Sequence, residues 1–373
     1  VAPAVRAGAS GLSAYLRLFL GQGGTGTAAR ARDEGERLGD DYSLCVALQA
    51  LAVAAGADAR VADAVQLAER AAATATRSSA AQVGVLHPHL TLGLVLLDAD
   101  RFDEAEAALR EGRRRAEERG SVAWLPLYHC VLALRRMLSG AWDDGLAEVG
   151  AGMALAEEVG TRLYVPFLHG MSAWVGIHRG ELVTAQAHME EAVREFLVST
   201  TASWQAEASE GLEAAGARWP LEWGLWINAL LNEARGDQAQ ALGDLENAWS
   251  AAAPLRYFLG YRLFGPDLVR IAAGAGNHAL ASAVTDEVAE GARRCGVASA
   301  TAAALRCQGL LDDDAMALAA AADAFRSTPR AMEMAFTSEE AGAALARCGR
   351  RAEAVGRLEE ARAFFEGVGA TRA

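Results

Sequence analysis

The feature that most constrains this chain is a repeat with a period near 40 residues. Asp100, Gly140 and Gly180 each follow an apolar stretch, precede an amphipathic run and are spaced by 40 residues. We call such turn positions anchor residues; further ones fall at Ala59, Gly236, Gly276, Asp312 and Gly349, with a weaker one at Gly24. A period of this length is typical of solenoids built from stacked units.

Small residues recur at a fixed distance from the anchors. Five residues after the eight stronger anchors stand Ala64, Ala105, Gly145, Ala185, Ala241, Ala281, Ala317 and Ala354. Two helices that pack 8–10 Å apart need small side chains at their crossing. Each unit is therefore expected to be a pair of helices, and the Ala-rich composition, with only 6% aromatic residues, favours helices throughout.

The predicted fold class is an all-α solenoid of antiparallel helical hairpins. The small-residue pattern resembles tetratricopeptide repeats, although the period exceeds their ~34 residues and would by itself also fit a HEAT-like array. We expect residues 1–373 to form a single array of eight or nine hairpins, with about sixteen to eighteen helices. Because the chain starts at Val1 without Met, we expect it to be a fragment of a longer protein.

One interval departs from the period. Gly180 and Gly236 are 56 residues apart, and the surplus falls in residues 197–220, which are rich in Ser, Thr, Gly and charge. We expect an insertion there, and the most mobile internal segment of the chain. The sequence leaves two interpretations open, namely a plain surface insertion or a lid over a groove.

Composition excludes several classes of function. All 35 basic residues are Arg, so the chain has neither a P-loop lysine nor a lysine for Schiff-base chemistry. The net charge of −13 predicts no direct binding to nucleic acid. The five cysteines lie far apart, which indicates reduced thiols and a cytoplasmic location. No apolar run is long enough to span a membrane.

No residue pattern indicates catalysis. The seven histidines form no metal-binding motif, and no nucleophile lies in a pattern with a base, so we expect no enzyme activity, no metal and no cofactor. His89, His129 and His169 share one register, eleven residues before an anchor. They are interpreted either as a packing position with local hydrogen bonds or as a polar ladder that meets a ligand.

The candidate binding face is the concave one. In tetratricopeptide-like arrays the first helix of each hairpin lines this face, through residues 13, 10, 6, 3 and 2 positions before the anchor. Here these positions are apolar and aromatic over several consecutive units, which marks a binding site if they are exposed and a core if a tight superhelix buries them. The candidate ligand-binding residues are His87, Phe167, Trp174, His178, Trp223, Trp226 and Arg270.

A specific hypothesis assigns roles to these residues. A mainly apolar small molecule is expected to dock against Phe167, Trp174, Trp223 and Trp226, with a polar contact from His178 or His87. Arg270, in the next unit, is expected to meet an acidic group of the ligand at the rim.

The last third of the chain resembles a known family. Residues Arg306 to Ala373, including the phrase LEEARAFFEGVGATRA, resemble the repeat region of large ATP-binding LuxR-family (MalT-like) transcriptional regulators of actinobacteria. The resemblance implies a sensor region that binds an effector and relays this to flanking ATPase and helix-turn-helix modules, neither of which lies in these 373 residues. The alternative is a protein–protein interaction or oligomerisation scaffold, including a homo-oligomer, with no small-molecule ligand.

Overall fold

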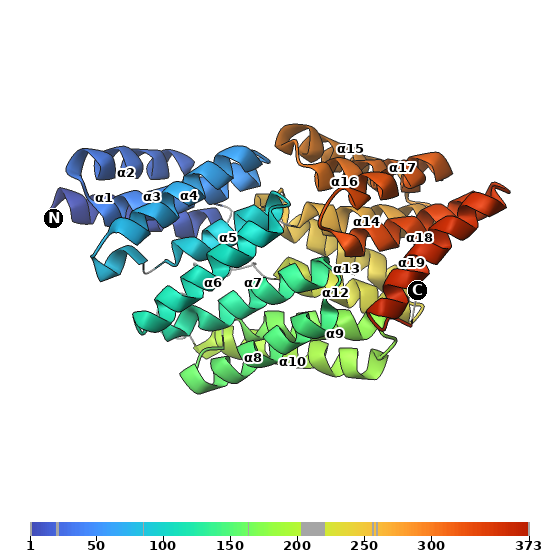
Figure 1. Ribbon diagram of the computed structural model, residues 1–373, viewed down its shortest axis with the longest axis horizontal. Coiled ribbons are helices and arrows are strands. Elements are labelled where there is room, and N and C mark those ends of the chain that lie inside the picture. The colour runs from blue at the N-terminus through green and yellow to red at the C-terminus, as the bar shows by residue number, and fades with distance from the viewer. Residues whose placement is uncertain are drawn as a thin grey trace.

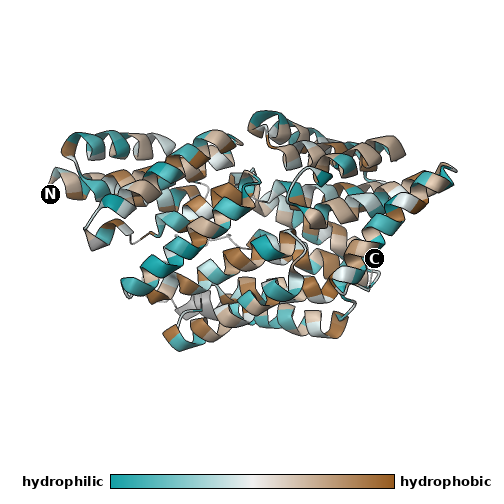
Figure 2. Cartoon of the chain, viewed as in Figure 1, coloured by the Kyte–Doolittle hydropathy of each residue, from teal (hydrophilic) through white to brown (hydrophobic). Residues whose placement is uncertain are grey.

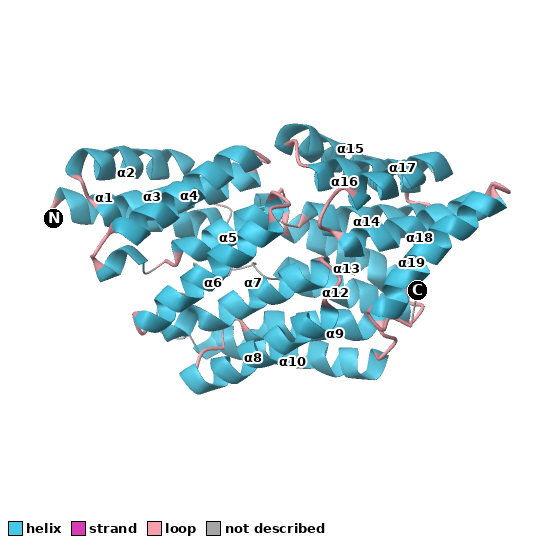
Figure 3. Ribbon diagram, viewed as in Figure 1, coloured by secondary structure: helices cyan, strands magenta, loops and turns pink. Residues whose placement is uncertain are grey.

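The computed structural model describes residues 2–19, 22–84, 86–162, 164–202, 221–255, 257–258 and 260–371, without the side chains of residues 19, 81 and 197–202. Over these residues the regular structure is helical, with eighteen α-helices and three short 3-10 helices and no strand (Figure 3). The all-α prediction is confirmed. No helix among them combines the length and the apolar character needed to cross a membrane.

The helices follow one another as hairpins, and each helix packs on its partner and on the next unit. The N-terminal hairpins are α1 (Pro3–Phe19) with α2 (Thr25–Leu38), α3 (Asp41–Ala57) with α4 (Val61–Arg77), α5 (Pro88–Asp98) with α6 (Phe102–Glu118), and α7 (Leu125–Leu138) with α8 (Trp142–Val159). They are followed by α9 (Val165–His178) with α10 (Leu182–Ala202), α12 (Leu221–Ala234) with α13 (Gln238–Ala251), α14 (Tyr261–Gly274) with α15 (His278–Cys295), α16 (Ala298–Asp312) with α17 (Ala315–Arg326), and α18 (Ala331–Arg347) with α19 (Arg351–Gly367). The 3-10 helices are η1 (Ala81–Gly84), η2 (Val122–Trp124) and η3 (Ala253–Leu255).

The anchor residues end the first helix of each hairpin through left-handed backbone. Gly180, for example, has a φ of 75°, and the next amide, of Glu181, donates to the carbonyl of Gly176 at 2.8 Å. This is the hydrogen bond that closes a helix C-terminus once one residue turns left-handed. Positive φ is found at all the predicted anchors except Asp312.

The prediction at Asp312 is wrong by one residue. Helix α16 continues through Asp312, and Asp313 takes the left-handed conformation, with a φ of 51°. The cause is the cap of the next helix, because the side chain of Asp314 accepts from the amides of Met316 and Ala317 and so fixes the start of α17. The small-residue position shifts accordingly, and Ala317 is only half-buried.

Most of the other predicted small residues lie at helix crossings. Ala64, Ala105, Ala185, Ala241 and Ala281 are at most 1% exposed. Figure 2 shows the same division at larger scale, with hydrophobic residues running along the helix faces that meet their neighbours. The core therefore runs continuously from unit to unit, as expected for a solenoid.

The superhelix turns far enough to close on itself. In Figure 1 the chain descends from the N-terminal helices to α9 and α10, returns through α12 to α14, and brings its C-terminal end back beside α9. Helix α18 packs against α7, and η3 packs against α3. Here Gly56 is required, because a Cβ at this position would lie 2.6 Å from the ring of Phe258.

A buried polar cluster joins the two sides of this closure. Arg330, which precedes α18, donates from Nε to Oδ1 of Asp100 at 2.7 Å. Arg262 of α14 forms an ion pair with Asp98 and donates to the hydroxyl of Ser299 at 2.6 Å. That hydroxyl donates in turn to Asp100 at 2.9 Å. We call these five residues, together with Glu333, the closure network.

The charges of the closure network stabilise one another away from water. Arg330, Arg262 and Asp98 are at most 2% exposed. Burial raises the pKa of Asp100, but the charges of Arg330 and Arg262 outweigh it and hold that pKa below its ordinary value. Removing one of its charged members would leave an uncompensated buried charge, which costs about 3–5 kcal/mol.

Candidate functional site

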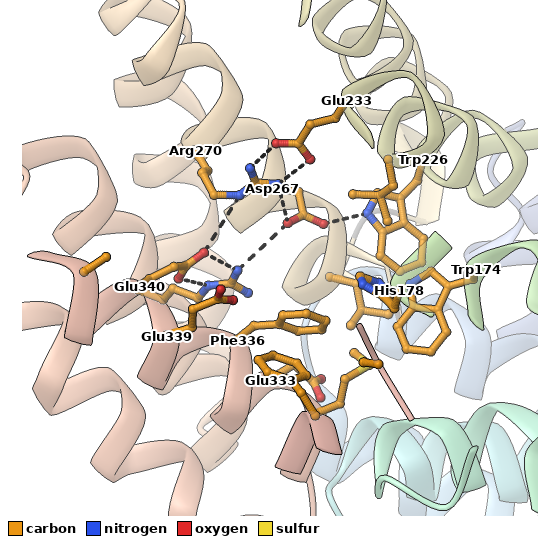
Figure 4. Close-up of a pocket in the computed structure, with 17 residues that line it drawn as sticks. Trp174, His178, Trp226, Glu233, Asp267, Arg270, Glu333, Phe336, Glu339 and Glu340 are labelled. Carbon is orange, nitrogen blue, oxygen red and sulfur yellow. Dashed lines mark hydrogen bonds and ion pairs between the residues drawn. The ribbon is translucent and has the colours of Figure 1, made fainter. Parts of the chain in front are cut away.

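A pocket of about 340 Å³ opens on the concave face (Figure 4). It is formed by the first helices of five consecutive units, α9, α12, α14, α16 and α18, with Phe365 of α19 and Ala370 at one edge. We call it the inner pocket. Its size lies at the lower end of the range found for ligand sites in proteins.

The repeat register explains which side chains reach this pocket. Trp174 and His178 are four residues apart on α9, and Trp226, Leu230 and Glu233 follow the same helical spacing on α12. Residues at this spacing lie on one face of a helix. Stacking the units therefore places the same face of each first helix around the inner pocket.

Aromatic rings make one wall of the inner pocket. The ring of Trp174 lies 4.8 Å from that of His178 and 6.4 Å from that of Trp226. Across the closure, His178 contacts Phe336 of α18 at 4.9 Å, and Phe336 contacts Phe365 at 5.3 Å. The pocket wall thus includes both sides of the closure.

The opposite wall is polar. Arg306 donates two hydrogen bonds to Glu340, at 2.6 and 2.7 Å. Arg270 is bonded to Glu233 by both terminal nitrogens, one of them at 2.9 Å, and lies 3.5 Å from Asp267. Figure 4 shows these groups as one connected network that extends through Asp267 to the indole of Trp226.

This geometry shows what already surrounds Arg270. Its charge is matched by carboxylates of the protein, with Glu340 also 3.9 Å from its Nε. A ligand carboxylate would have to displace Glu233 or Asp267 and enter a pocket that is already acidic. Arg270 therefore organises the polar wall, and its contact with an acidic group of a ligand stays a prediction.

Two of the other predicted residues line a different hollow. Phe167 and Trp223 face a groove of about 480 Å³ between α9, α10 and α12, which we call the lateral groove. Its remaining walls include Met171, Met189 and Phe196 and are mainly apolar. The predicted aromatic set is nevertheless continuous, because Trp223 contacts both Phe167, at 6.3 Å, and Trp226, at 5.8 Å.

His87 lines neither the inner pocket nor the lateral groove. It precedes α5 with left-handed backbone, at a φ of 47°, and its ring stacks on Trp124 at 5.2 Å. Its nitrogens are within hydrogen-bond distance of Tyr128 and Ser121, at 3.2 and 3.0 Å. Burial lowers the pKa of His87 to about 4. His87 therefore holds the loop before α5 and lies apart from Trp174 and Trp226, and its contact with a ligand stays a prediction.

The histidine register favours the packing interpretation. His129 lies 2.7 Å from Glu148 of the partner helix, and His169 lies 3.0 Å from His188 at the equivalent position of the next hairpin. These contacts join the two helices within a hairpin. The part of the chain that the structure describes contains no cluster of three or more potential metal ligands.

The concave face is far less exposed than an open groove would be. Trp174, Trp223 and Trp226 are 5–9% exposed, and the inward residues of earlier units, such as Leu90 and Cys130, are equally buried. The interpretation in which a tight superhelix buries these side chains thus holds for most of the face. The predicted residues Trp174, His178, Trp226 and Arg270 nevertheless line the inner pocket.

The sequence contained a signal for several pocket residues that the prediction missed. Phe336, Glu339 and Ala343 lie 13, 10 and 6 positions before the anchor Gly349, and Arg306 lies six before Asp312. Extending the inward register to the last two units would have found them. Glu333 is outside that register, and it lines the pocket because the closure brings the start of α18 to this face.

Of the predicted insertion at 197–220, the structure describes only residues 197–202. The backbone of residues 197–202 continues α10, and the description resumes with α12 at Leu221. The expected mobility and the lid interpretation concern residues 203–220, which lie outside the described residues.

Comparison with known proteins relates this chain to others by fold alone. No protein-family model and no curated protein matches its sequence. Among solved structures, a Rap protein complexed with competence and sporulation factor is similar, with a TM-score of 0.65 and 9% sequence identity. The match covers 98% of this chain and 99% of the Rap chain. It supports the tetratricopeptide-like solenoid, and none of these comparisons adds to the LuxR-family resemblance.

Proposed function

We propose that this chain is a non-catalytic binding module whose inner pocket holds a short segment of a partner protein or peptide. The observation that carries the proposal is the pocket itself, which combines an aromatic wall with five carboxylates from the three helices α12, α14 and α18 on one concave face. Pockets that bind peptides use such a pairing, with apolar area for affinity and fixed polar groups for orientation.

The chemistry of the pocket favours this over an apolar small molecule. Such a ligand would leave Oε2 of Glu333 and the indole nitrogen of Trp174 buried without partners, since neither atom has one among the described residues. Leaving a buried polar group unpaired costs about 1–3 kcal/mol. The similar Rap protein was solved in complex with competence and sporulation factor, which supports a partner-binding role for a fold of this kind.

We further propose that the module serves a transcriptional regulator of the LuxR family. The support is the resemblance of Arg306 to Ala373 to the repeat regions of those proteins. Reading the gene on both sides of this segment tests it. An ATPase module before it and a helix-turn-helix after it are expected, and an unrelated context would remove this part of the proposal.

The binding proposal is tested by selecting displayed random peptides on the chain and measuring their affinity by calorimetry. Ala343 is exposed and lines the pocket, so Ala343→Trp is expected to fill the pocket without disturbing the core. Ala346→Trp is the matched control, because Ala346 is equally exposed on the same helix but outside the pocket.

Binding is expected to weaken about tenfold or more in Ala343→Trp, as burying a side chain in the pocket contributes ~1.5–3 kcal/mol. The control should bind as the parent does. Failure to select any peptide, or equal binding by both variants, would overturn the proposal.

A further inference from the structure

The inner pocket has more negative than positive groups. Five carboxylates line it, those of Glu233, Asp267, Glu333, Glu339 and Glu340, against two guanidinium groups. Both guanidinium groups are already engaged by carboxylates on the polar wall. The pocket therefore favours a positively charged ligand and disfavours an anion.

One carboxylate oxygen is positioned to receive that charge. Oε1 of Glu333 accepts from Arg330 at 2.9 Å, which fixes the carboxylate, whereas Oε2 is buried and has no hydrogen-bond partner among the described residues. Glu333 is 2% exposed and lines the pocket. Buried carboxylates are ordinarily paired at both oxygens, so this oxygen lacks a donor that a ligand can supply.

A second unpaired group lies across the same pocket. The indole nitrogen of Trp174 is buried, lines the pocket through its side chain and has no acceptor among the residues that the structure describes. Figure 4 shows Trp174 beside His178, and Glu333 below Phe336. A ligand that satisfies both groups must donate to Glu333 and accept from Trp174.

We propose that the inner pocket binds a cationic nitrogen carried on an apolar stem, presented by a Lys or Arg side chain or by the free N-terminus of a peptide. The cation donates to Oε2 of Glu333, and a neighbouring carbonyl of the ligand accepts from Trp174. The stem packs on the rings of Trp226 and Phe336, whose faces also attract a cation. This deepens the proposed function by naming the chemistry of the partner.

The test uses the whole chain labelled with 5-fluorotryptophan, whose eight tryptophans report by fluorine NMR. The Trp174 signal is assigned with Trp174→Phe. The probes are N-acetyl-arginine methylamide, leucine amide with a free amino group, and N-acetyl-citrulline methylamide, which has the shape of the arginine probe without its charge. The first two compare a side-chain cation with a free N-terminus.

We expect at least one cationic probe to shift the Trp174 signal in a saturable way, with the citrulline probe at least about tenfold weaker. Glu333→Gln should abolish the difference between arginine and citrulline. Glu246→Gln, at an exposed position outside the pocket, should leave it unchanged. Glu339→Gln removes a pocket charge without touching the closure network and should weaken the cationic probes several-fold.

Equal binding of arginine and citrulline, or no shift with either cation, would overturn the inference. If Glu333→Gln fails to fold, the comparison of probes on the unchanged chain and on Glu339→Gln decides it. Selected peptides that lose binding in Ala343→Trp but carry no cation at the pocket would keep the proposed function and refute this inference. A saturable shift of the Trp174 signal by the arginine probe, without any selected peptide, would keep this inference and refute the proposed function.

Discussion

The inner pocket and the lateral groove lie on either side of α12 and are built in different ways. Trp226 lines one and Trp223, three residues earlier, lines the other. The lateral groove has walls from α9, α10 and α12 and is mainly apolar. The inner pocket adds walls from α14, α16 and α18, and these supply most of its charged groups. The lateral groove lies between neighbouring helices, so it is lined by the apolar faces on which those helices pack. The inner pocket is completed by the closure, which brings charged residues from distant units together.

The largest effect is expected from breaking the closure. Arg330→Ala leaves Glu333 buried without its cation and removes the hydrogen bond that Arg330 donates to Asp100. The free energy of unfolding, measured with denaturant, is expected to fall by about 3–5 kcal/mol. The fluorine signal of Trp174 should shift, whereas that of Trp223 should change little, because the lateral groove does not depend on the closure.

The matched control is Arg326→Ala. Arg326 pairs with Asp323 and Glu360, but its side chain is 49% exposed. Exposed pairs contribute only ~0–1 kcal/mol. Equal losses in the two variants, or equal shifts of both tryptophan signals, would show that the two hollows do not differ in their dependence on the closure.

A smaller effect separates the two tryptophans of α12. The indole nitrogen of Trp226 donates to Asp267 at 2.8 Å. Trp226→Phe should therefore lower the free energy of unfolding by about 1–3 kcal/mol beyond the loss of ring area. Trp223→Phe provides the comparison, because among the described residues the indole nitrogen of Trp223 has no hydrogen bond of this kind. Thermal unfolding that ranks Trp223→Phe as the more damaging change would reverse this assignment.

The smallest effect concerns acid and the helices beside the lateral groove. Burial lowers the pKa of both His169 and His188. The charges of His188 and Arg194 lower the pKa of His169 further, whereas those of Glu191 and Glu195 raise it. A folded pKa below the unfolded value means that the unfolded chain binds more protons. The stability contributed by this pair is therefore lost as the pH falls below about 6.5.

His188→Glu would give His169 the kind of partner that His129 has in Glu148. The variant is expected to lose less stability than the parent between pH 7 and pH 5, by about 0.5–1 kcal/mol, as for an ordinary partly exposed ion pair. Chemical denaturation at the two pH values measures this. Identical pH dependence in the two proteins would contradict it.

The repeat made much of the fold predictable. The anchors needed left-handed residues, the small residues needed helix crossings, and both follow from local chemistry that each unit repeats. Asp312 shows the limit of this approach, because the cap at Asp314 moved the turn by one residue. The inward register also placed Trp174, His178, Trp226 and Arg270 around one pocket.

The closure could not be predicted in this way. Arg330 and Asp100 are 230 residues apart, and their contact depends on small rotations summed over several units. A register can say that Arg270 points inward, but not that Glu233, Asp267 and Glu340 surround it. For the same reason it could not separate the buried inward residues of the early units from the accessible ones.

The closed superhelix changes what it means for this solenoid to have ends. In an open array each unit is stabilised only by its neighbours, so the terminal hairpins fray first and the middle unfolds last. Here Arg179 donates to the carbonyl of Val368 at 2.9 Å, and the amide of Thr371 donates to the carbonyl of His178 at 3.2 Å. The last hairpin is therefore expected to unfold together with the middle of the chain. Loosening one unit of this closed array destabilises the unit to which it is bonded across the closure.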